Sequence, residues 1–318
     1  MLLGHAATLD SRPSTIGCQN PFVKVVMSGA SGLIGSALLP ALRADGHDVV
    51  RLVRGEPTDA DEIRWDPASG KLDASRLEGT DAIVNLSGEN IGQRWSDARR
   101  REILASRTST TGLLSRTAAA LDPRPSVFVC ASAIGAYGDR GDEILTEDSE
   151  LGSGFVADVV RAWEDAADPA REAGIRVAHL RQGIVLAHDG GALERMLLPF
   201  KLGVGGRIGS GKQWFSWVAM ADIVGGYRRT LSTDLSGAVN VTAPNPVTNE
   251  QFTKALGSAL SRPTIFPVPG FAIRTLFGDM GDEMLLSGQR VLPTKLLDAA
   301  FEFAAPTIDV GLEQALAE

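Results

Sequence analysis

Apolar residues along the chain fall into short continuous runs separated by stretches of helical periodicity. The apolar runs are residues 23–27, 48–53, 82–86, 127–131 and 175–180. The helical patterns between them cover residues 33–43, 97–121 and 155–173. Runs that are apolar on both faces are typical of parallel strands covered by helices on both sides. The pattern therefore predicts an α/β fold with a doubly wound parallel sheet in the N-terminal half.

The pattern changes after Arg181. Residues 202–212 are rich in glycine, and residues 238–242 have the pattern of one more strand of the same sheet. Prolines become frequent beyond Pro244, and short helices are predicted between the turns. We therefore expect a second, smaller α+β lobe toward the C-terminus.

A glycine-rich turn follows the first apolar run. Gly29, Gly32 and Gly35 have the spacing G-x-x-G-x-x-G, and a helical pattern begins within this motif. In such turns the first glycine allows a tight bend, the second lets a phosphate approach the backbone, and the third allows close helix packing. The helix N-terminus then offers free N–H groups to a pyrophosphate. A purely structural turn is the alternative to a dinucleotide site. The residues predicted to bind the dinucleotide are Gly29, Ser31, Gly32, Leu33 and Ile34.

The end of the second apolar run distinguishes the two nicotinamide dinucleotides. NAD-binding folds place Asp or Glu there against the ribose 2′-hydroxyl, whereas an Arg suits the 2′-phosphate of NADP. In this sequence the run is followed by Arg54, and no carboxylate occurs before Glu56. Arg54 therefore favours NADP (NADPH), and a surface arginine at a strand end is the alternative.

Composition excludes several other classes of protein. The net charge of −8 argues against a general nucleic-acid binder, and no apolar window is long enough to span a membrane. Cys18 and Cys130 lie far apart and form no metal-binding pattern, so we expect no metal site, no disulfide framework and a reducing cytoplasmic location. Residues 1–22 have no signal-peptide pattern, and we expect an irregular extension there.

Several longer motifs resemble those of the short-chain dehydrogenase/reductase superfamily. They are residues 29–35, 85–92, 106–107, 132–138, 181–186, 213–217, 245–249 and 288–293. From residue 23 onward the chain is similar to the extended, epimerase/dehydratase-like branch, and most of all to atypical epimerase family proteins with a C-terminal domain of unknown function. The resemblance implies an NADP-binding Rossmann domain at 23–182 with a returning segment near 215–243. It also implies a smaller substrate-binding lobe at 183–214 and 244–318.

The resemblance and the positions of polar and aromatic residues together indicate roles for individual side chains. Ser132 matches the superfamily's catalytic serine, which hydrogen-bonds a substrate oxygen, although a capping role at a strand end is equally open. Glu164 could direct a carboxylate toward the cleft, but most carboxylates on helices are simply solvated. Asn85, Leu86, Ser87 and Gly88 would pass beside the cofactor's ribose. Arg181, Trp214 and Trp217 are the predicted substrate-binding residues, through an anionic group and through apolar walls respectively.

The acid–base pair of active relatives is missing. In those enzymes a Tyr exchanges the substrate proton, and a Lys four residues later lowers the pKa of that Tyr. The corresponding positions are Phe155 and Val159, which carry no proton to exchange and no charge. The chain has two tyrosines, and neither has a lysine four residues later. Tyr137 is the candidate replacement acid, with a structural role as the alternative.

Two functions follow from these observations. The first is an NADP-dependent oxidoreductase or epimerase-like enzyme that acts on a small or nucleotide-linked carbonyl substrate. The second is a noncatalytic NADP-binding protein that senses the cofactor or assembles with a partner. We favour the first, because an aromatic second lobe beside a cofactor cleft exceeds what cofactor sensing requires. We expect a small-molecule substrate, no nucleic-acid or membrane partner, and a monomer or homodimer.

Overall fold

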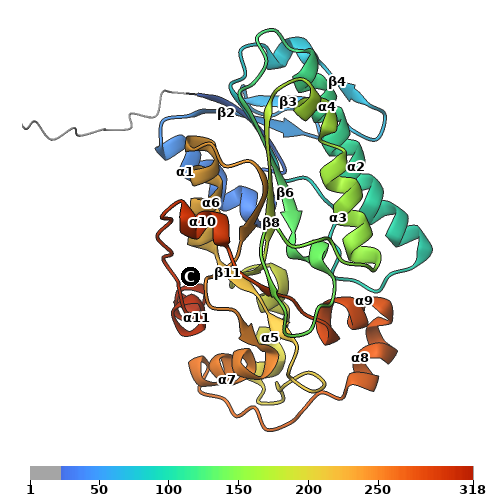
Figure 1. Cartoon of the computed structure of the whole chain (residues 1–318), viewed down its shortest axis with the longest axis vertical. Coiled ribbons are helices and arrows are strands. Elements are labelled where there is room, and N and C mark those ends of the chain that lie inside the picture. The colour runs from blue at the N-terminus through green and yellow to red at the C-terminus, as the bar shows by residue number, and fades with distance from the viewer. Residues whose placement is uncertain (1–22, 318) are drawn as a thin grey trace, which may run out of the picture.

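A computed structural model describes residues 23–317, so the extension expected at 1–22 lies outside the described residues. An eight-stranded sheet lies between two layers of helices, and a smaller second lobe lies below it (Figure 1). Among the residues described, every helix is too short or too polar to cross a membrane.

The sheet has the strand order β12-β8-β6-β5-β1-β2-β3-β4. Its strands are β1 (Lys24–Ser28), β2 (Asp48–Val53), β3 (Glu62–Asp66), β4 (Lys71–Leu72), β5 (Ala82–Asn85), β6 (Val127–Ala133), β8 (Arg176–Gln182) and β12 (Gly237–Val241). All neighbouring pairs are parallel except β3 and β4. The predicted doubly wound sheet is confirmed, and the strand order reverses between β1 and β5, where such sheets bind ligands.

Helices cover both faces of the sheet because both faces of its strands are apolar. The helices α1 (Leu33–Ala44) and α6 (Met220–Ser232) cover one face, with Leu38, Leu42 and Tyr227 in its core. The other face is covered by α2 (Asp97–Ala120), α3 (Phe155–Asp165) and α4 (Asp168–Glu172), with Leu114 and Trp163 in its core. Figure 1 shows these two helical layers on opposite sides of the strands.

Two elements differ from the sequence-based expectation. The helix expected over 155–173 is two helices, and the second begins with Pro169 in its first turn. The strand β3 was not expected, because Glu62, Arg64 and Asp66 make its sequence strongly polar. Alternate side chains of β3 are nevertheless buried, so it extends the sheet beyond β2.

The second lobe contains short strands and helices that follow β8 in the chain, together with β7, which pairs with β14. Its strands are β7 (Ile144–Leu145), β9 (Ile184–Leu186), β10 (Trp214–Phe215), β11 (Trp217–Ala219), β13 (Val247–Thr248) and β14 (Arg290–Val291). Its helices are α5 (Gly191–Lys201), α7 (Asn249–Ala259), α8 (Gly270–Phe277), α9 (Asp279–Gly281) and α11 (Ile308–Ala317), whereas α10 (Thr294–Asp298) packs against β12 on the face covered by α1 and α6. Short helical turns also occur at η1 (Ala74–Leu77), η2 (Ile134–Tyr137) and η3 (Asp282–Leu286). Phe215, Trp217, Phe252 and Leu312 lie together in its core.

Candidate functional site

The glycine turn between β1 and α1 leaves no room for side chains at two of its three glycines. Gly29 has a φ of +74°, and a Cβ there would lie 2.8 Å from the carbonyl carbon of Leu86. A Cβ on Gly35 would lie 2.2 Å from the carbonyl oxygen of Gly29. The first and third glycines are therefore required by the turn itself.

The second glycine of the motif has a different environment. A Cβ on Gly32 would meet only the carbonyl oxygen of Gly29, at 3.3 Å, and the residue is exposed. Gly32 is also the N-cap of α1, and no side chain caps this helix. The first N–H groups of α1 and the positive end of its dipole thus face an accessible surface, which fits a dinucleotide phosphate.

The next two predicted residues, Leu33 and Ile34, are half-buried at the start of α1. The Leu33 side chain lies against the loop before α5, where a Cβ on Gly190 or Gly191 would approach it to 3.1 Å. Ser31 is exposed. The second lobe therefore contacts the glycine turn directly through Leu33.

Arg54 directly follows β2, as the sequence indicates. Its side chain is 79% exposed, and its Nη1 lies 3.8 Å from Oε1 of Glu89. An exposed ion pair of this length contributes little to stability. The guanidinium is consequently available to a ligand at the end of β2.

Asn85 holds the loop that follows β5. Its Oδ1 accepts hydrogen bonds from the Ser28 hydroxyl (2.7 Å) and from the backbone N–H of Ser87 (3.2 Å). Its Nδ2 donates to Thr111 Oγ1 at 2.8 Å. The side chain is fully buried, so it fixes Leu86, Ser87 and Gly88 rather than contacting a ligand itself.

A second group of polar residues lies in register across three parallel strands. Ser132 of β6 pairs with Arg181 of β8, which pairs with Asn240 of β12. Residues in register on parallel strands point to the same face of the sheet, and here α3 covers that face. The sheet thus brings together two predicted residues, Ser132 and Arg181, with Asn240, which was not predicted.

Glu164 of α3 joins this row of residues. Its Oε1 accepts a hydrogen bond from Ser132 Oγ at 2.6 Å, and its two oxygens accept from Arg181 Nε and Nη2 at 2.9 and 2.8 Å. Burial alone would raise the pKa of Glu164, but its hydrogen bonds and Arg181 hold the pKa below the usual value. Arg181 is therefore already paired with an internal carboxylate, which argues against the predicted contact between Arg181 and an anionic group of the substrate.

Tyr137 lies at the other side of Arg181. Its hydroxyl donates to Asn240 Oδ1 at 2.7 Å and accepts from Arg181 Nη1 at 3.1 Å. Burial raises the pKa of Tyr137, and the effect of Arg181 only partly opposes this. A tyrosine that exchanges a proton in catalysis needs a lowered pKa and access to the substrate, whereas Tyr137 is fully buried, so its environment favours the structural interpretation.

Phe155 and Val159 are packed into an apolar cluster at the start of α3. The Phe155 ring meets the Trp95 ring edge to face at 4.9 Å, and the Arg100 guanidinium lies 4.4 Å from the Phe155 ring centre. Val159 and Met280 are buried in the same cluster. The positions of the missing acid–base pair thus serve packing between α3 and the C-terminal segment.

The two predicted tryptophans have different environments. Trp217 is fully buried, and a Cβ on Gly311 would approach its ring to 2.3 Å, so it is a core residue rather than a cleft wall. Trp214 is half-buried, donates from Nε1 to Asp142 Oδ1 at 2.8 Å, and lies 4.4 Å from the Arg290 guanidinium. Only Trp214 keeps surface that a ligand could contact.

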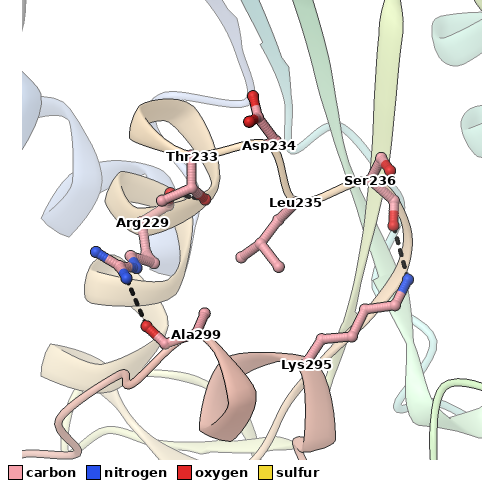
Figure 2. Close-up of a pocket in the computed structure, with 7 residues that line it drawn as sticks. All are labelled: Arg229, Thr233, Asp234, Leu235, Ser236, Lys295 and Ala299. Atoms are coloured by element: carbon pink, nitrogen blue, oxygen red, sulfur yellow. Dashed lines mark hydrogen bonds between the residues drawn. The ribbon is translucent and has the colours of Figure 1, made fainter.

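A hollow of about 440 Å³ lies away from these residues, where the chain enters β12. It is lined by Arg229, Thr233, Asp234, Leu235, Ser236, Lys295 and Ala299. Figure 2 shows that its two basic side chains already donate to backbone carbonyls, of Ala299 and Ser236. None of these lining residues belongs to the glycine turn, so the hollow is separate from the candidate dinucleotide site.

Residues 23–317 contain no group of three or more potential metal ligands from His, Cys, Asp and Glu.

The sequence could not show how Glu164 and Asn240 are used. Asn240 had a weak signal, because it is a polar residue inside an otherwise apolar strand pattern. Glu164 is only one of many carboxylates on helices, and its partners lie 17 and 32 residues away. Their roles became visible only when α3 was placed over the sheet.

A doubly wound parallel sheet with a glycine turn at the switch point defines the class of Rossmann-type dinucleotide-binding folds. Residues 25–242 match the model of the NAD dependent epimerase/dehydratase family, and residues 268–315 match a domain of unknown function, DUF1731. The chain belongs to the NAD dependent epimerase/dehydratase family.

Individual relatives agree with this assignment. An epimerase family protein of Mycobacterium bovis is 44% identical over 91% of this chain and 96% of its own length. The crystal structure of human epimerase family protein SDR39U1 with NADPH has a TM-score of 0.83 and 34% identity, covering 93% of this chain and 99% of that one. A nucleoside-diphosphate sugar epimerase from Corynebacterium glutamicum has a TM-score of 0.78 and 35% identity, covering 93% of this chain and 58% of that one.

Proposed function

We propose that the protein binds NADPH on the glycine turn between β1 and α1. The observation that carries this proposal is the environment of Gly32, which is exposed beside an uncapped helix N-terminus. Arg54 supplies an exposed positive charge at the end of β2, paired only with Glu89 at 3.8 Å, which suits a 2′-phosphate. The solved human relative contains NADPH, which supports the same cofactor here.

The function that the site supports best is an oxidoreductase or epimerase-like reaction on a carbonyl or alcohol of a small or nucleotide-linked sugar substrate. Bound NADPH would supply the hydride to a carbonyl, with the proton taken from water, and bound NADP would accept the hydride from an alcohol, with the proton released to water. Ser132 is 2% exposed and donates its proton to Glu164, so its oxygen can accept a hydrogen bond from a substrate alcohol, whereas its hydroxyl would have to turn away from Glu164 to donate to a substrate carbonyl. Glu164 acts as the positioning residue for Ser132, and Arg181 keeps Glu164 ionised.

A noncatalytic NADPH-binding role is the second candidate. It is favoured by the packing of Phe155 and Val159, since both positions of the usual acid–base pair are filled by apolar side chains. In this case the protein would report cofactor binding through the contact between Leu33 and the loop before α5. We further propose a cytoplasmic protein that acts on a small molecule as a monomer or homodimer, without nucleic-acid or membrane partners.

Calorimetric titration with NADPH tests the cofactor site. Gly32→Ala adds a methyl group to the surface proposed for the phosphate, 3.3 Å from the Gly29 carbonyl oxygen, so we expect NADPH binding to weaken about tenfold or more with only a small fall in melting temperature. Gly55→Ala is the matched control, because a Cβ there meets nothing within 4 Å. Equal affinity of the Gly32→Ala variant and the wild type would place the cofactor elsewhere.

Oxidation of NADPH with a panel of carbonyl compounds, and reduction of NADP with the corresponding alcohols, separates the two candidates. The catalytic proposal expects turnover that Ser132→Ala abolishes and Glu164→Gln lowers mainly in kcat. Tight NADPH binding without turnover on the panel would favour the noncatalytic role.

A further inference from the structure

Arg107 of α2 lies beneath the loop that follows β5 and has no acidic partner. Its Cζ lies 3.3 Å from the position that a Cβ on Gly88 would take. Its Nη1 donates to the Ile103 carbonyl at 3.1 Å. Within residues 23–317, no carboxylate oxygen lies within 4 Å of its guanidinium, since Glu89 pairs instead with other arginines.

The surroundings of Arg107 make an unpaired charge costly. Desolvation by burial lowers the pKa of Arg107 to about 10, so the side chain still carries its charge at neutral pH. Arg107 is half-buried, and Glu89 attracts its charge only from beyond ion-pair distance, so the desolvation of this charge is only partly compensated within the protein. Its Nε and Nη2 are not among the fully buried polar atoms that lack partners, so these nitrogens keep access to solvent.

The Arg107 guanidinium lies beside the ring of Trp163. Its Cζ lies 5.0 Å from the ring centre of Trp163, and Trp163 Nε1 donates to Thr111 Oγ1 at 3.0 Å. Thr111 also accepts from Asn85, which holds the loop of Ser87 and Gly88. The ring beside the guanidinium and the loop above it are thus joined through the hydrogen bonds of Thr111 and Asn85.

We infer that Arg107 forms an anion-binding subsite, which takes a phosphate or a carboxylate of a ligand bound beside the loop of residues 86–88. A planar guanidinium with two free nitrogens matches the paired oxygens of such groups. Gly88 leaves the space over the guanidinium clear of a side chain. The inference rests on the proposed function, since it adds an anion contact to the same cleft.

Two sources could supply the anionic group. It belongs either to the phosphates of NADPH or to an acidic substrate that binds after NADPH. Titration with NADPH tests the first source. Titration of the NADPH-loaded protein with inorganic phosphate, and separately with acetate, tests the second.

The variants are Arg107→Met, Arg107→Lys and Arg101→Met. Methionine keeps an apolar stem for packing on Trp163 but removes the charge, whereas lysine keeps the charge without the planar fork. Arg101 is the matched control, because it is an exposed arginine of the same helix. We expect Arg107→Met to weaken binding of NADPH, or of phosphate or acetate to the loaded protein, by about tenfold to a hundredfold. Arg107→Lys should be intermediate, and Arg101→Met should match the wild type.

The melting temperature without ligand distinguishes an anion subsite from a structural arginine. Without ligand, the melting temperature of Arg107→Met should equal or exceed that of the wild type, because the substitution removes an incompletely compensated charge. With the anionic ligand, the variant should lack the rise in melting temperature that the ligand gives the wild type. A lowered melting temperature with unchanged affinity in every titration would overturn the inference. If the wild type does not bind NADPH, the proposed cofactor is wrong. Phosphate and acetate are then titrated into the protein without NADPH, and binding by the wild type but not by Arg107→Met would still support the subsite.

Discussion

His179 of β8 shows how burial controls a single titratable group. Its side chain is 2% exposed, its Nδ1 has no hydrogen-bond partner, and its Nε2 lies 3.2 Å from Arg171 Nη2. Burial lowers the pKa of His179 to about 4, although Glu164 partly opposes the shift. The imidazole is therefore neutral at physiological pH and acts as a packed part of the sheet face.

The lowered pKa of His179 predicts a pH dependence of stability. Between about pH 6.5 and pH 4 the unfolded chain binds a proton at this residue and the folded protein does not, so stability falls as the pH falls. We expect His179 to contribute roughly 2 to 3 kcal/mol to the loss of unfolding free energy between pH 7 and pH 4.5. Urea unfolding at the two pH values measures this loss.

Two variants isolate the contribution of His179 from those of other groups. His179→Gln should lose less stability than the wild type over the same pH interval. His188→Gln, which changes a histidine with a partly exposed side chain, should keep the wild-type dependence. An identical loss in wild type and His179→Gln would show that another group controls the acid sensitivity.

The helix α3 receives its N-terminal cap from a distant part of the chain. Gly154, the N-cap, has a φ of +109° and no side chain to accept the first N–H groups. Instead the Glu283 carboxylate accepts from the N–H groups of Phe155 and Val156, at 3.1 and 3.0 Å. Negative charge at this end of a helix also interacts favourably with the helix dipole.

Removal of the Glu283 charge should weaken α3. Glu283→Gln keeps one acceptor oxygen but loses the charge and one of the two hydrogen bonds, so we expect a loss of about 1 kcal/mol in unfolding free energy. Glu102→Gln, which affects only an exposed ion pair on α2, should cost less than about 0.5 kcal/mol. Chemical denaturation at pH 7 compares the two variants, and equal small effects would argue against the capping role.

Periodicity in the sequence predicted the strands and helices that are buried in the sheet, because their patterns are local. It could not predict the cap on α3, since Glu283 is separated from Phe155 by 128 residues. It also could not distinguish Trp217, a core residue, from Trp214, because both occur in one aromatic segment. The glycine turn was predictable, since Gly29 and Gly35 are required by the backbone of the turn and Gly32 completes the spacing of the motif.

The C-terminal segment is packed against the rest of the protein rather than appended to it. Asp222 of α6 accepts from the N–H groups of Ala304 and Ala305, and Arg94 donates to the carbonyls of Thr275 and Leu276. The helix α11 lies on Trp217, with Gly311 at the closest approach. These contacts make the C-terminal segment part of one cooperative structure.

Substitution at the contact between α11 and Trp217 tests this cooperativity. A Cβ on Gly311 would lie 2.3 Å from the Trp217 ring, so Gly311→Ala should destabilise the protein by about 1 to 3 kcal/mol, despite the higher helix propensity of alanine. A single thermal transition should shift to a lower temperature, with Gly55→Ala as the control. Separate melting of the C-terminal segment, or no shift, would contradict this arrangement.

The packing around Phe155 limits which substitutions could restore the acid–base pair of active relatives. Restoring the acid–base pair would require a tyrosine at Phe155 and a lysine at Val159. The lysine would enter a buried apolar cluster, and a lysine ammonium is costly to bury without a counter-charge. The tyrosine alone would add a hydroxyl to a ring already enclosed by Trp95 and Arg100. A single substitution therefore supplies no complete acid–base pair and the double substitution loses stability, so the proton chemistry of active relatives is not one mutation away for this chain.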